Sequence, residues 1–363
     1  MHRLFVVCPP GLEQVLSREM GVLPSAGGVE TEGDLSRAAR LNLALRTATR
    51  VLVRLGEFHA TNFAELVKKA RALPFDLCLR KGERVALRVT CHKSRLYHSK
   101  AVAQRLHEAI GERLGAPPPE ATADEESDAP PQLLLARFDH DVCTVSADTS
   151  GALLHRRGYR LAQSRAPLRE TLAAAMLLAA GYDGSAALVD PLCGSGTIAI
   201  EGALIARRRA PGIARSFALE RWPGFDAAAL ASLRDEARGR ELAKASHGIL
   251  ASDSDPAAVR AAQENAKRAG VEADVRTGER PLREVRLEPG PGLIVTNPPY
   301  GVRVSADLTR LYSDLGDLVR RSGHRLAVLA SNRGATAAAK LRFETAFRTQ
   351  NGGIPVELLV ANR

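Results

Sequence analysis

The sequence has few cysteines and no long apolar run, and each shortage excludes a class of protein. Its five cysteines are scattered, and no two have the Cys-x-x-Cys spacing of a zinc site or redox pair, so we expect neither a metal site nor a disulfide framework. No stretch approaches the roughly 18 apolar residues of a membrane span. The first residues also lack the apolar length of a signal peptide. We therefore expect a cytoplasmic protein that does not bind membranes. A monomer is the default expectation for its oligomeric state.

Acidic residues are also fewer than basic residues, and the imbalance differs from one part of the chain to another. The chain carries 51 Lys and Arg against 41 Asp and Glu, a formal net charge of +10. Residues 1–115 hold 19 basic and 11 acidic side chains, whereas residues 116–131 hold five acidic side chains and no basic one. Because positive charge attracts polyanions, we expect the first third of the chain to form the docking surface for a nucleic acid.

Short strands and amphipathic helices predict a small mixed α/β region over the first 150 residues. Strands are expected over 3–8, at the end of 35–56, and over 84–90, 133–138 and 142–147; helices are expected up to about residue 20, in the first part of 35–56, and over 62–73 and 99–114. Residues 116–131 contain five prolines besides their acidic residues, which predicts a flexible surface loop.

The pattern changes after residue 150. Residues 155–169 hold five arginines and no acidic residue, which indicates a basic linker, placed here at 151–166. From about residue 167, helices and strands alternate regularly. Such alternation predicts a doubly wound, mainly parallel sheet over 167–363.

A glycine loop joins the first expected strand of this sheet to a helix. The strand over 186–190 leads into Pro191-Leu192-Cys193-Gly194-Ser195-Gly196, and a helix follows from Thr197. Glycines let the backbone pass close to a ligand, and a helix N-terminus presents unpaired N–H groups to a carboxylate. The same pattern also fits an ordinary turn between a strand and a helix.

The next strand, over 248–252, is followed by an acidic residue, Asp253. A carboxylate at a strand tip can accept both hydrogen bonds of a ribose diol, so we place Asp253 in a nucleotide-type cofactor site. Asp255 has a plainer interpretation as the N-cap of the following helix, with Pro256 at its first position.

A later strand, over 292–296, leads into Asn297-Pro298-Pro299-Tyr300. The NH2 group on a base is a poor nucleophile because its lone pair is delocalised into the ring. The Asn297 side-chain oxygen and the Pro298 carbonyl are two acceptors that can hold such an amine toward a methyl donor, and consecutive prolines stiffen the turn. Tyr300 can stack on a base that has left its own stack. The alternative is a structural Pro-Pro turn with an Asx cap.

These residues resemble a known family. The stretches at 190–196, 252–256 and 297–301 resemble the amino-methyltransferases with the class I fold. Residues 90–110 are similar to the second half of a THUMP domain, an RNA-binding module. Residues 153–182 and 217–226 resemble the junction and an insert of the THUMP-containing RNA guanine-N2 methyltransferases.

The resemblance implies a class I Rossmann-like methyltransferase domain, with a mainly parallel seven-stranded sheet and a terminal antiparallel strand, over 167–363. It implies S-adenosyl-L-methionine as cofactor and RNA as partner. Before this domain it implies an α/β, ferredoxin-like segment over 1–56 and a small α/β THUMP-type RNA-binding domain over 57–150. Family members that act on ribosomal RNA often carry a second methyltransferase domain, and single-unit relatives act on tRNA, so both RNAs stay open.

The family's site residues carry over position by position. The matches to its cofactor site are Asp190, Pro191, Cys193, Gly194, Ser195, Gly196 and Thr197 in the glycine loop, Asp253 at the ribose and Ser254 at the adenine edge. The family usually has an aspartate after the third strand for the adenine amino group, and here Glu279 stands at about that place. Asn297, Pro298, Pro299 and Tyr300 match the catalytic loop.

Two basic stretches are candidates for RNA contact. The first contains Lys93, Arg95, Tyr97, His98 and Lys100, where charge and an aromatic ring suit phosphate contact with stacking. The second contains Arg156, Arg157 and Arg160 in the linker. The alternatives are a solvated loop for the first stretch and salt bridges between domains for the second.

Guanine N2 in structured RNA is the target we expect. An adenine-N6 methyltransferase acting on RNA or DNA is the alternative, because the same tetrapeptide serves that amine, and a protein glutamine methyltransferase is a third enzyme hypothesis. A non-catalytic RNA-binding assembly factor that retains the fold is the alternative from another class, although every element of the pocket is intact in the sequence.

Overall fold

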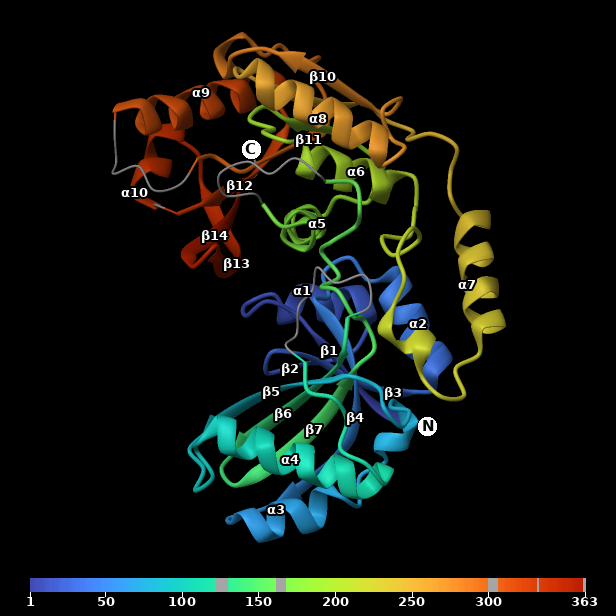
Figure 1. The fold of residues 1–363 in the computed structure, drawn as a ribbon. Coiled ribbons are helices and arrows are strands. Elements are labelled where there is room, and N and C mark those ends of the chain that lie inside the picture. The colour runs from blue at the N-terminus through green and yellow to red at the C-terminus, as the bar shows by residue number, and fades with distance from the viewer. Residues whose placement is uncertain (122–129, 161–167, 300–305, 332, 362–363) are drawn as a thin grey trace.

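Two seven-stranded sheets, one in each half of the chain, form the computed structural model (Figure 1). The structure describes residues 1–121, 130–160, 168–299, 306–331 and 333–361. Tyr300 and the central part of the predicted acidic loop, 122–129, lie outside the described residues. None of the helices within these ranges is long and apolar enough to cross a membrane.

The N-terminal sheet combines hairpins with one parallel pair. Its elements are β1 (His2–Val7), α1 (Glu13–Met20), β2 (Pro24–Ser25), β3 (Gly28–Gly33), α2 (Leu35–Ala44), β4 (Arg50–His59), α3 (Phe63–Ala70), β5 (Val85–His92), α4 (Ser99–Leu114), β6 (Gln132–Asp139) and β7 (Val142–Asp148). The strand order is β2-β3-β1-β4-β7-β6-β5; among these named strands β5 and β6 pair in parallel, and the other neighbours pair antiparallel. Helix α4 packs against β5 of this sheet, and α3 packs against α4 (Figure 1).

Most of these elements are where the sequence predicts them, and α4 has the predicted bounds. The β2–β3 hairpin is not predicted, because two of its residues are glycines and only Val29 of β3 is a buried apolar residue. The boundary predicted at residue 56 falls inside β4, which pairs with β1 on one side and β7 on the other. One sheet therefore spans both predicted N-terminal segments.

The C-terminal sheet confirms the predicted class I arrangement. Its elements are α5 (Glu170–Ala179), β8 (Ala187–Asp190), α6 (Thr197–Ala206), α7 (Ala227–Gly239), β9 (Ile249–Asp253), α8 (Pro256–Arg268), β10 (Val275–Glu279), β11 (Gly292–Thr296), α9 (Ala306–Ser322), β12 (Arg325–Ala330), α10 (Arg333–Thr336), β13 (Phe343–Asn351) and β14 (Ile354–Ala361). The order is β10-β9-β8-β11-β12-β14-β13, with β14 antiparallel to both neighbours. The carboxyl ends of β8, β9, β10 and β11 therefore meet at one edge.

An insert after α6 attaches the two halves to each other on one side. The backbone N–H of Gly212 donates to the carbonyl of Leu43, and that of Leu219 donates to the carbonyl of Thr149. The fully buried Trp222 donates its indole N–H to Gln132 Oε1 at 2.8 Å. This insert contains the stretch 217–226 that the sequence analysis singled out.

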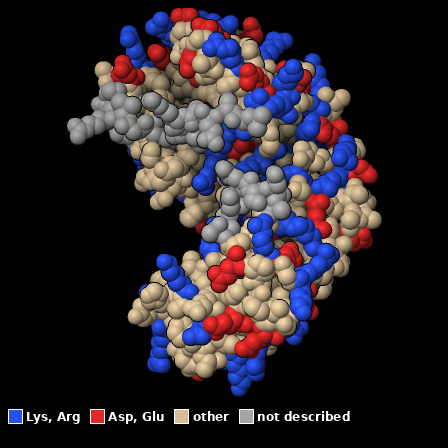
Figure 2. Space-filling view, in the orientation of Figure 1, with Lys and Arg blue, Asp and Glu red and all other residues tan. Residues whose placement is uncertain are grey.

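The hairpin of β13 and β14 makes the second attachment. Thr349 Oγ1 donates to the carbonyl of Pro10 at 2.8 Å. Gly11 lies so close to β13 that a Cβ would meet the carbonyl oxygen of Arg348 at 1.7 Å, so only glycine fits there. The insert and this hairpin thus both join the two halves, with a hollow between the halves on the left of Figure 2.

Candidate active site

The glycine loop follows β8 and leads into α6 as predicted. Gly194 and Gly196 both have positive φ angles, of 50° and 82°. A Cβ on Gly196 would lie 2.9 Å from the Cβ of Ala262, so this glycine lets α6 pack against α8. A Cβ on Gly194 would meet nothing within 4 Å, so the space beside this part of the loop is open to a ligand.

Asp253 links the tip of β9 to the glycine loop. Its Oδ2 accepts the N–H of Gly194 at 2.9 Å, and its Oδ1 accepts the N–H of Asp255 at 3.0 Å. Each carboxylate oxygen can accept a further hydrogen bond. Asp255 caps α8 by accepting the N–H of Ala257 at 2.8 Å, which confirms its plainer interpretation. Glu279 ends β10 directly opposite Asp253 in the sheet register.

Asp190 connects the glycine loop to the strand before the catalytic turn. Thr296 Oγ1 donates to Asp190 Oδ1 at 2.9 Å, and the N–H of Leu192 donates to the same oxygen at 3.3 Å. Burial raises the pKa of Asp190 to about 7, and the nearby charge of Asp253 adds to the rise. Thr296 was missed by the sequence analysis, although the adjacency of β8 and β11 in a class I sheet is the signal that could have found it.

The turn predicted to be catalytic starts at the end of β11, beside β8. Asn297 is half-buried, Pro298 is buried and Pro299 is exposed. Because Thr296 immediately precedes Asn297, its bond to Asp190 ties this turn to the cofactor loop. The structure thus brings the predicted glycine loop, strand-tip acids and catalytic turn to one edge of the sheet.

Cys193 packs inside the loop. Its side chain is buried, and its backbone N–H donates to the carbonyl of Ser252 at 2.9 Å. Burial raises the pKa of its thiol well above the ordinary value. A neutral thiol is a poor nucleophile, so Cys193 fills space in the loop.

A chain of polar contacts runs from the glycine loop toward the N-terminal half. Asn265 on α8 donates its Nδ2 to the carbonyl of Ser195 at 2.9 Å. Arg268 donates to Asn265 Oδ1 at 2.5 Å and, through Nε, to the carbonyl of Tyr159 at 2.8 Å. Tyr159 donates its hydroxyl to Glu201 Oε1 at 3.1 Å.

The chain of contacts ends in residues 155–160, which we call the junction segment. Arg157 is only 6% exposed; its Nε lies 3.7 Å from Glu201 Oε1, and its two terminal nitrogens donate to the carbonyls of Leu154 and Arg46. The prediction that Arg157 contacts RNA is therefore wrong for this conformation, because its guanidinium is enclosed by protein.

Arg160 is engaged in the same way. It donates to the carbonyl of Leu168 at 2.7 Å and lies 3.4 Å from Glu170 Oε2, and its side chain is 11% exposed. Because Arg160 and Glu170 both lie within the matched methyltransferase half, this contact is not the predicted salt bridge between domains, and RNA contact by Arg160 remains a prediction. Arg156 is exposed, so its predicted contact with RNA remains a prediction.

Residues 93–100, which we call the basic loop, have the opposite surroundings. Lys93, Arg95, His98 and Lys100 are exposed, and Tyr97 is 77% exposed. The backbone is held in place: Leu96 is buried at 6% exposure, and the N–H of Arg95 donates to Asp141 Oδ1 at 2.6 Å. RNA binding by these five side chains remains a prediction.

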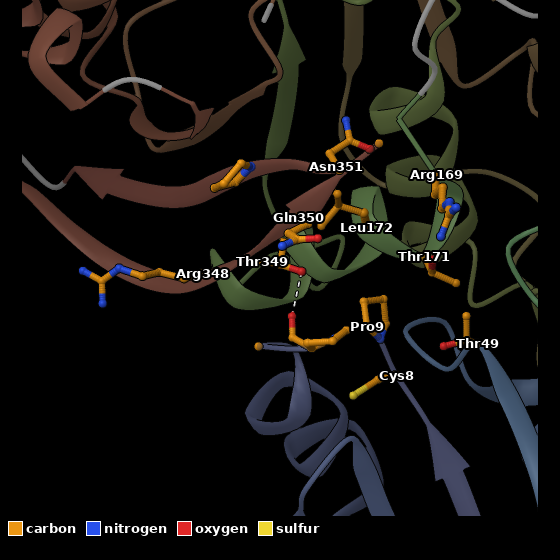
Figure 3. A pocket seen from close by; sticks show the side chains of 15 residues that line it. Cys8, Pro9, Thr49, Arg169, Thr171, Leu172, Arg348, Thr349, Gln350 and Asn351 are labelled. Carbon is orange, nitrogen blue, oxygen red and sulfur yellow. Dashed lines mark hydrogen bonds between the residues drawn. The ribbon is translucent and has the colours of Figure 1, made fainter. Parts of the chain in front are cut away.

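A pocket of about 830 Å³ lies between the two halves (Figure 3). It is lined by the turn after β1 (Cys8, Pro9, Pro10 and Gly11), by Thr49, by the start of α5 with Arg169, and by the β13–β14 hairpin. Glu357, the fourth residue of β14, pairs with Ala330 at the carboxyl end of β12, so the hairpin tip extends beyond the edge that carries the predicted site. The predicted cofactor and catalytic residues are not among the described residues that line the pocket.

Comparison with known proteins agrees with this geometry. Residues 157–358 match the family model described as the RMKL-like methyltransferase domain. The chain belongs to this methyltransferase family. Its cofactor is therefore S-adenosylmethionine. Residues 3–52 match a second model, the RlmL ferredoxin-like domain.

Relatives extend over the whole chain. The ribosomal RNA large subunit methyltransferase K/L of Syntrophotalea carbinolica is 34% identical over 98% of this chain and 53% of its own length. The protein of that name from Cellvibrio japonicus is 34% identical over 99% of this chain and 51% of its own. The chain thus spans about half the length of the curated relatives it matches.

Solved structures share the whole fold. A putative methyltransferase, SMU.472, complexed with SAH, is 28% identical with a TM-score of 0.89, over 99% of this chain and 98% of that one. A predicted N6-adenine-specific DNA methylase from Listeria monocytogenes is 31% identical with a TM-score of 0.87, over 99% and 96%. TrmN from Thermus thermophilus, at 18% identity and a TM-score of 0.74 over 100% of each chain, shares the fold.

Proposed function

We propose that this chain transfers a methyl group from S-adenosylmethionine to the exocyclic N2 amine of a guanine in structured RNA. One observation carries the proposal: the Asn297-Pro298 turn starts at the end of β11 and is joined to the cofactor loop through the Thr296–Asp190 hydrogen bond. Amine acceptors and a methyl donor site are thereby held at the same edge of one sheet.

The residues at this edge fit the cofactor. The open space beside Gly194 leaves room for the ligand against the loop. The N-terminus of α6 offers backbone N–H groups to its carboxylate. Asp253 retains acceptor capacity for the ribose hydroxyls, and Ser254 and Glu279 would lie toward the adenine. When bound, S-adenosylmethionine supplies an electrophilic methyl group.

The catalytic turn orients the acceptor. The Asn297 side-chain oxygen and the Pro298 carbonyl would accept the two N–H bonds of the base amine, which directs its lone pair away from the turn and toward the methyl group. Because Pro298 and Pro299 restrict the backbone, the acceptors need little reorganisation. The predicted stacking by Tyr300 would hold the flipped base. The methylated amine is cationic and loses its proton to solvent.

RNA is the substrate class that the remaining features favour. The basic loop exposes positive charge and an aromatic ring on a surface of the N-terminal half. Both curated relatives are named as methyltransferases of large-subunit ribosomal RNA. We therefore propose ribosomal RNA as the first substrate to test, with tRNA second, and a cytoplasmic monomer as the working form.

Adenine N6 is the second candidate target. A structure that is 31% identical to this chain is named as a predicted N6-adenine-specific DNA methylase, and the same two acceptors would orient that amine. The non-catalytic alternative is disfavoured, because Asn297, both loop glycines and Asp253 are all in place.

The test is methyl transfer from labelled S-adenosylmethionine to ribosomal RNA and tRNA from a strain that lacks this gene. We expect N2-methylguanosine in one RNA class after digestion. Asn297→Ala removes one acceptor and should lower the rate by about 10²–10³-fold. Calorimetric titration with S-adenosylmethionine is the control, and it should show unchanged affinity in this variant. N6-methyladenosine would establish the second candidate, whereas tight cofactor binding without transfer to any RNA would contradict the proposal.

A further inference from the structure

Two histidines and an aspartate lie close together where strands β5 and β6 of the N-terminal sheet end. His92 ends β5, Asp139 ends β6, and His140 follows in the turn before β7. One ligand atom from each of the three lies within 4.8 Å of the others. Nδ1 of His92 and Nδ1 of His140 each lie 2.8 Å from Asp139 Oδ1. We call these three residues the His-Asp-His cluster.

The backbone fixes this cluster independently of any ligand. Parallel pairing of β5 with β6 sets His92 directly opposite Asp139. His140 and Asp141 have φ angles of 50° and 62°, so the chain reverses tightly and brings His140 beside its neighbour Asp139. The N–H of His140 also donates to the carbonyl of His92 at 3.2 Å. Little conformational entropy is therefore lost when a ligand binds to all three side chains.

The donor set is that of a divalent transition-metal site. Two imidazole nitrogens and one carboxylate oxygen suit Zn²⁺ and other divalent transition-metal ions, whereas Mg²⁺ and Ca²⁺ prefer oxygen ligands alone. Ligand distances for Zn²⁺ are about 2.0–2.2 Å, so the three atoms can surround an ion after small side-chain rotations. Arg137 lies 3.4 Å from Asp139 Oδ2. The other oxygen of that carboxylate, Oδ1, faces the two histidines.

We propose that His92, Asp139 and His140 form a binding site for a divalent transition-metal ion of the Zn²⁺ class. The three side chains are 59%, 40% and 67% exposed, so an ion can enter from solvent and keep an open coordination position. The site is independent of the proposed methyl transfer. It differs from the sequence-based expectation of no metal, because His92 and Asp139 are 47 residues apart and no local spacing reveals them.

The test uses the full-length protein after removal of metal with a chelator. Calorimetric titration with Zn²⁺ should show a site of one ion per chain, and Co²⁺ should give an absorption spectrum without a thiolate charge-transfer band. His140→Ala and Asp139→Asn should each lower the affinity for Zn²⁺ by more than about tenfold. Replacing a residue that only hydrogen-bonds to a metal ligand typically costs at least about tenfold, and a ligand itself should cost more. Both positions are outside the core, and Asp139→Asn keeps the shape of the side chain.

His247→Ala is the matched control, because His247 is also exposed but lies in the other half of the molecule. It should leave the affinity for Zn²⁺ unchanged, and circular dichroism should show that all variants are folded. Absence of Zn²⁺ binding by the wild-type protein would overturn the proposal. So would equal affinity in the wild-type protein and both cluster variants, or a cobalt spectrum with a thiolate band.

Discussion

The basic loop and the junction segment have similar compositions but opposite environments. Both carry several Lys or Arg residues, and from sequence both are candidates for RNA contact. In the basic loop the charged groups are exposed and only Leu96 is buried. In the junction segment Arg157 is enclosed and lies beside the fully buried Glu201. A cluster of arginines therefore indicates RNA binding only where its charges remain in contact with solvent.

The positive charge gathered in and around the junction segment affects the pKa of His155. Burial lowers the pKa of His155 to about 3, and the positive charges of Arg169, Arg160, Arg156 and Arg157 lower it further. His155 is thus neutral at physiological pH. Glu201 lies beside Arg157 and Glu170 lies beside Arg160, so a carboxyl group accompanies each of these two guanidinium groups.

The largest expected effect comes from replacing Arg157. Arg157→Ala would leave Glu201 buried beside Tyr159 without its cation, and would remove the donors to two backbone carbonyls. We expect the free energy of unfolding to fall by about 3–5 kcal/mol, as is typical when one partner of a buried ion pair is removed. Urea unfolding followed by circular dichroism measures the change.

Arg95→Ala in the basic loop is the matched control for this experiment. Its side chain is exposed, so the free energy of unfolding should change by less than about 0.5 kcal/mol. Equal effects of the two substitutions would remove the distinction between the two segments.

A second buried charge gives a pH-dependent effect at the cofactor edge. Because burial raises the pKa of Asp190 to about 7, the unfolded chain loses this proton at lower pH than the folded chain does. The stability from this group is therefore present below about pH 4 and is lost as the pH rises toward 7, by about 1.4 kcal/mol for each unit of pKa shift.

Asp190→Asn removes this ionisation. The free energy of unfolding of the variant minus that of wild type should be larger at pH 8 than at pH 4. Urea unfolding of both proteins at the two pH values measures this difference. Glu170, whose pKa burial also raises to about 7, is present in both proteins and cancels. A difference between the two proteins that does not vary with pH would show that folding leaves the pKa of Asp190 unchanged.

A smaller effect tests whether the buried contacts reach the cofactor. Asn265→Ala removes the hydrogen bond to the carbonyl of Ser195 in the glycine loop. A typical net hydrogen bond is worth about 0.5–1.5 kcal/mol, so affinity for S-adenosylmethionine should fall by roughly 2- to 10-fold. Calorimetric titration measures it, with Lys267→Ala on the exposed side of the same helix as control. If both variants bind the cofactor like wild type, Asn265 has only a structural role.

The sequence predicts that the glycine loop, Asp253 and Asn297 lie at one edge of the sheet, but it does not predict the contacts of the junction, for a physical reason. The glycine loop, Asp253 and Asn297 lie next to strand ends, so local periodicity is enough to place them at one edge of the sheet. The burial of Arg157 depends on Glu201 and on the carbonyl of Arg46, which is 111 residues away. The His-Asp-His cluster likewise requires the pairing of β5 with β6, which no local pattern predicts.

The salt dependence of RNA binding tests most directly whether the basic loop is the RNA-contacting segment. The measurement compares wild type with a triple variant carrying Lys93→Ala, Arg95→Ala and Lys100→Ala, and with a control carrying Lys244→Ala, Lys267→Ala and Arg283→Ala. For each phosphate that a variant no longer binds, the slope of log affinity against log salt concentration should decrease in magnitude by about 0.7–0.9. We predict this decrease for the loop variant alone, with unchanged stability. An unchanged slope, or an equal decrease in the control, would contradict the account.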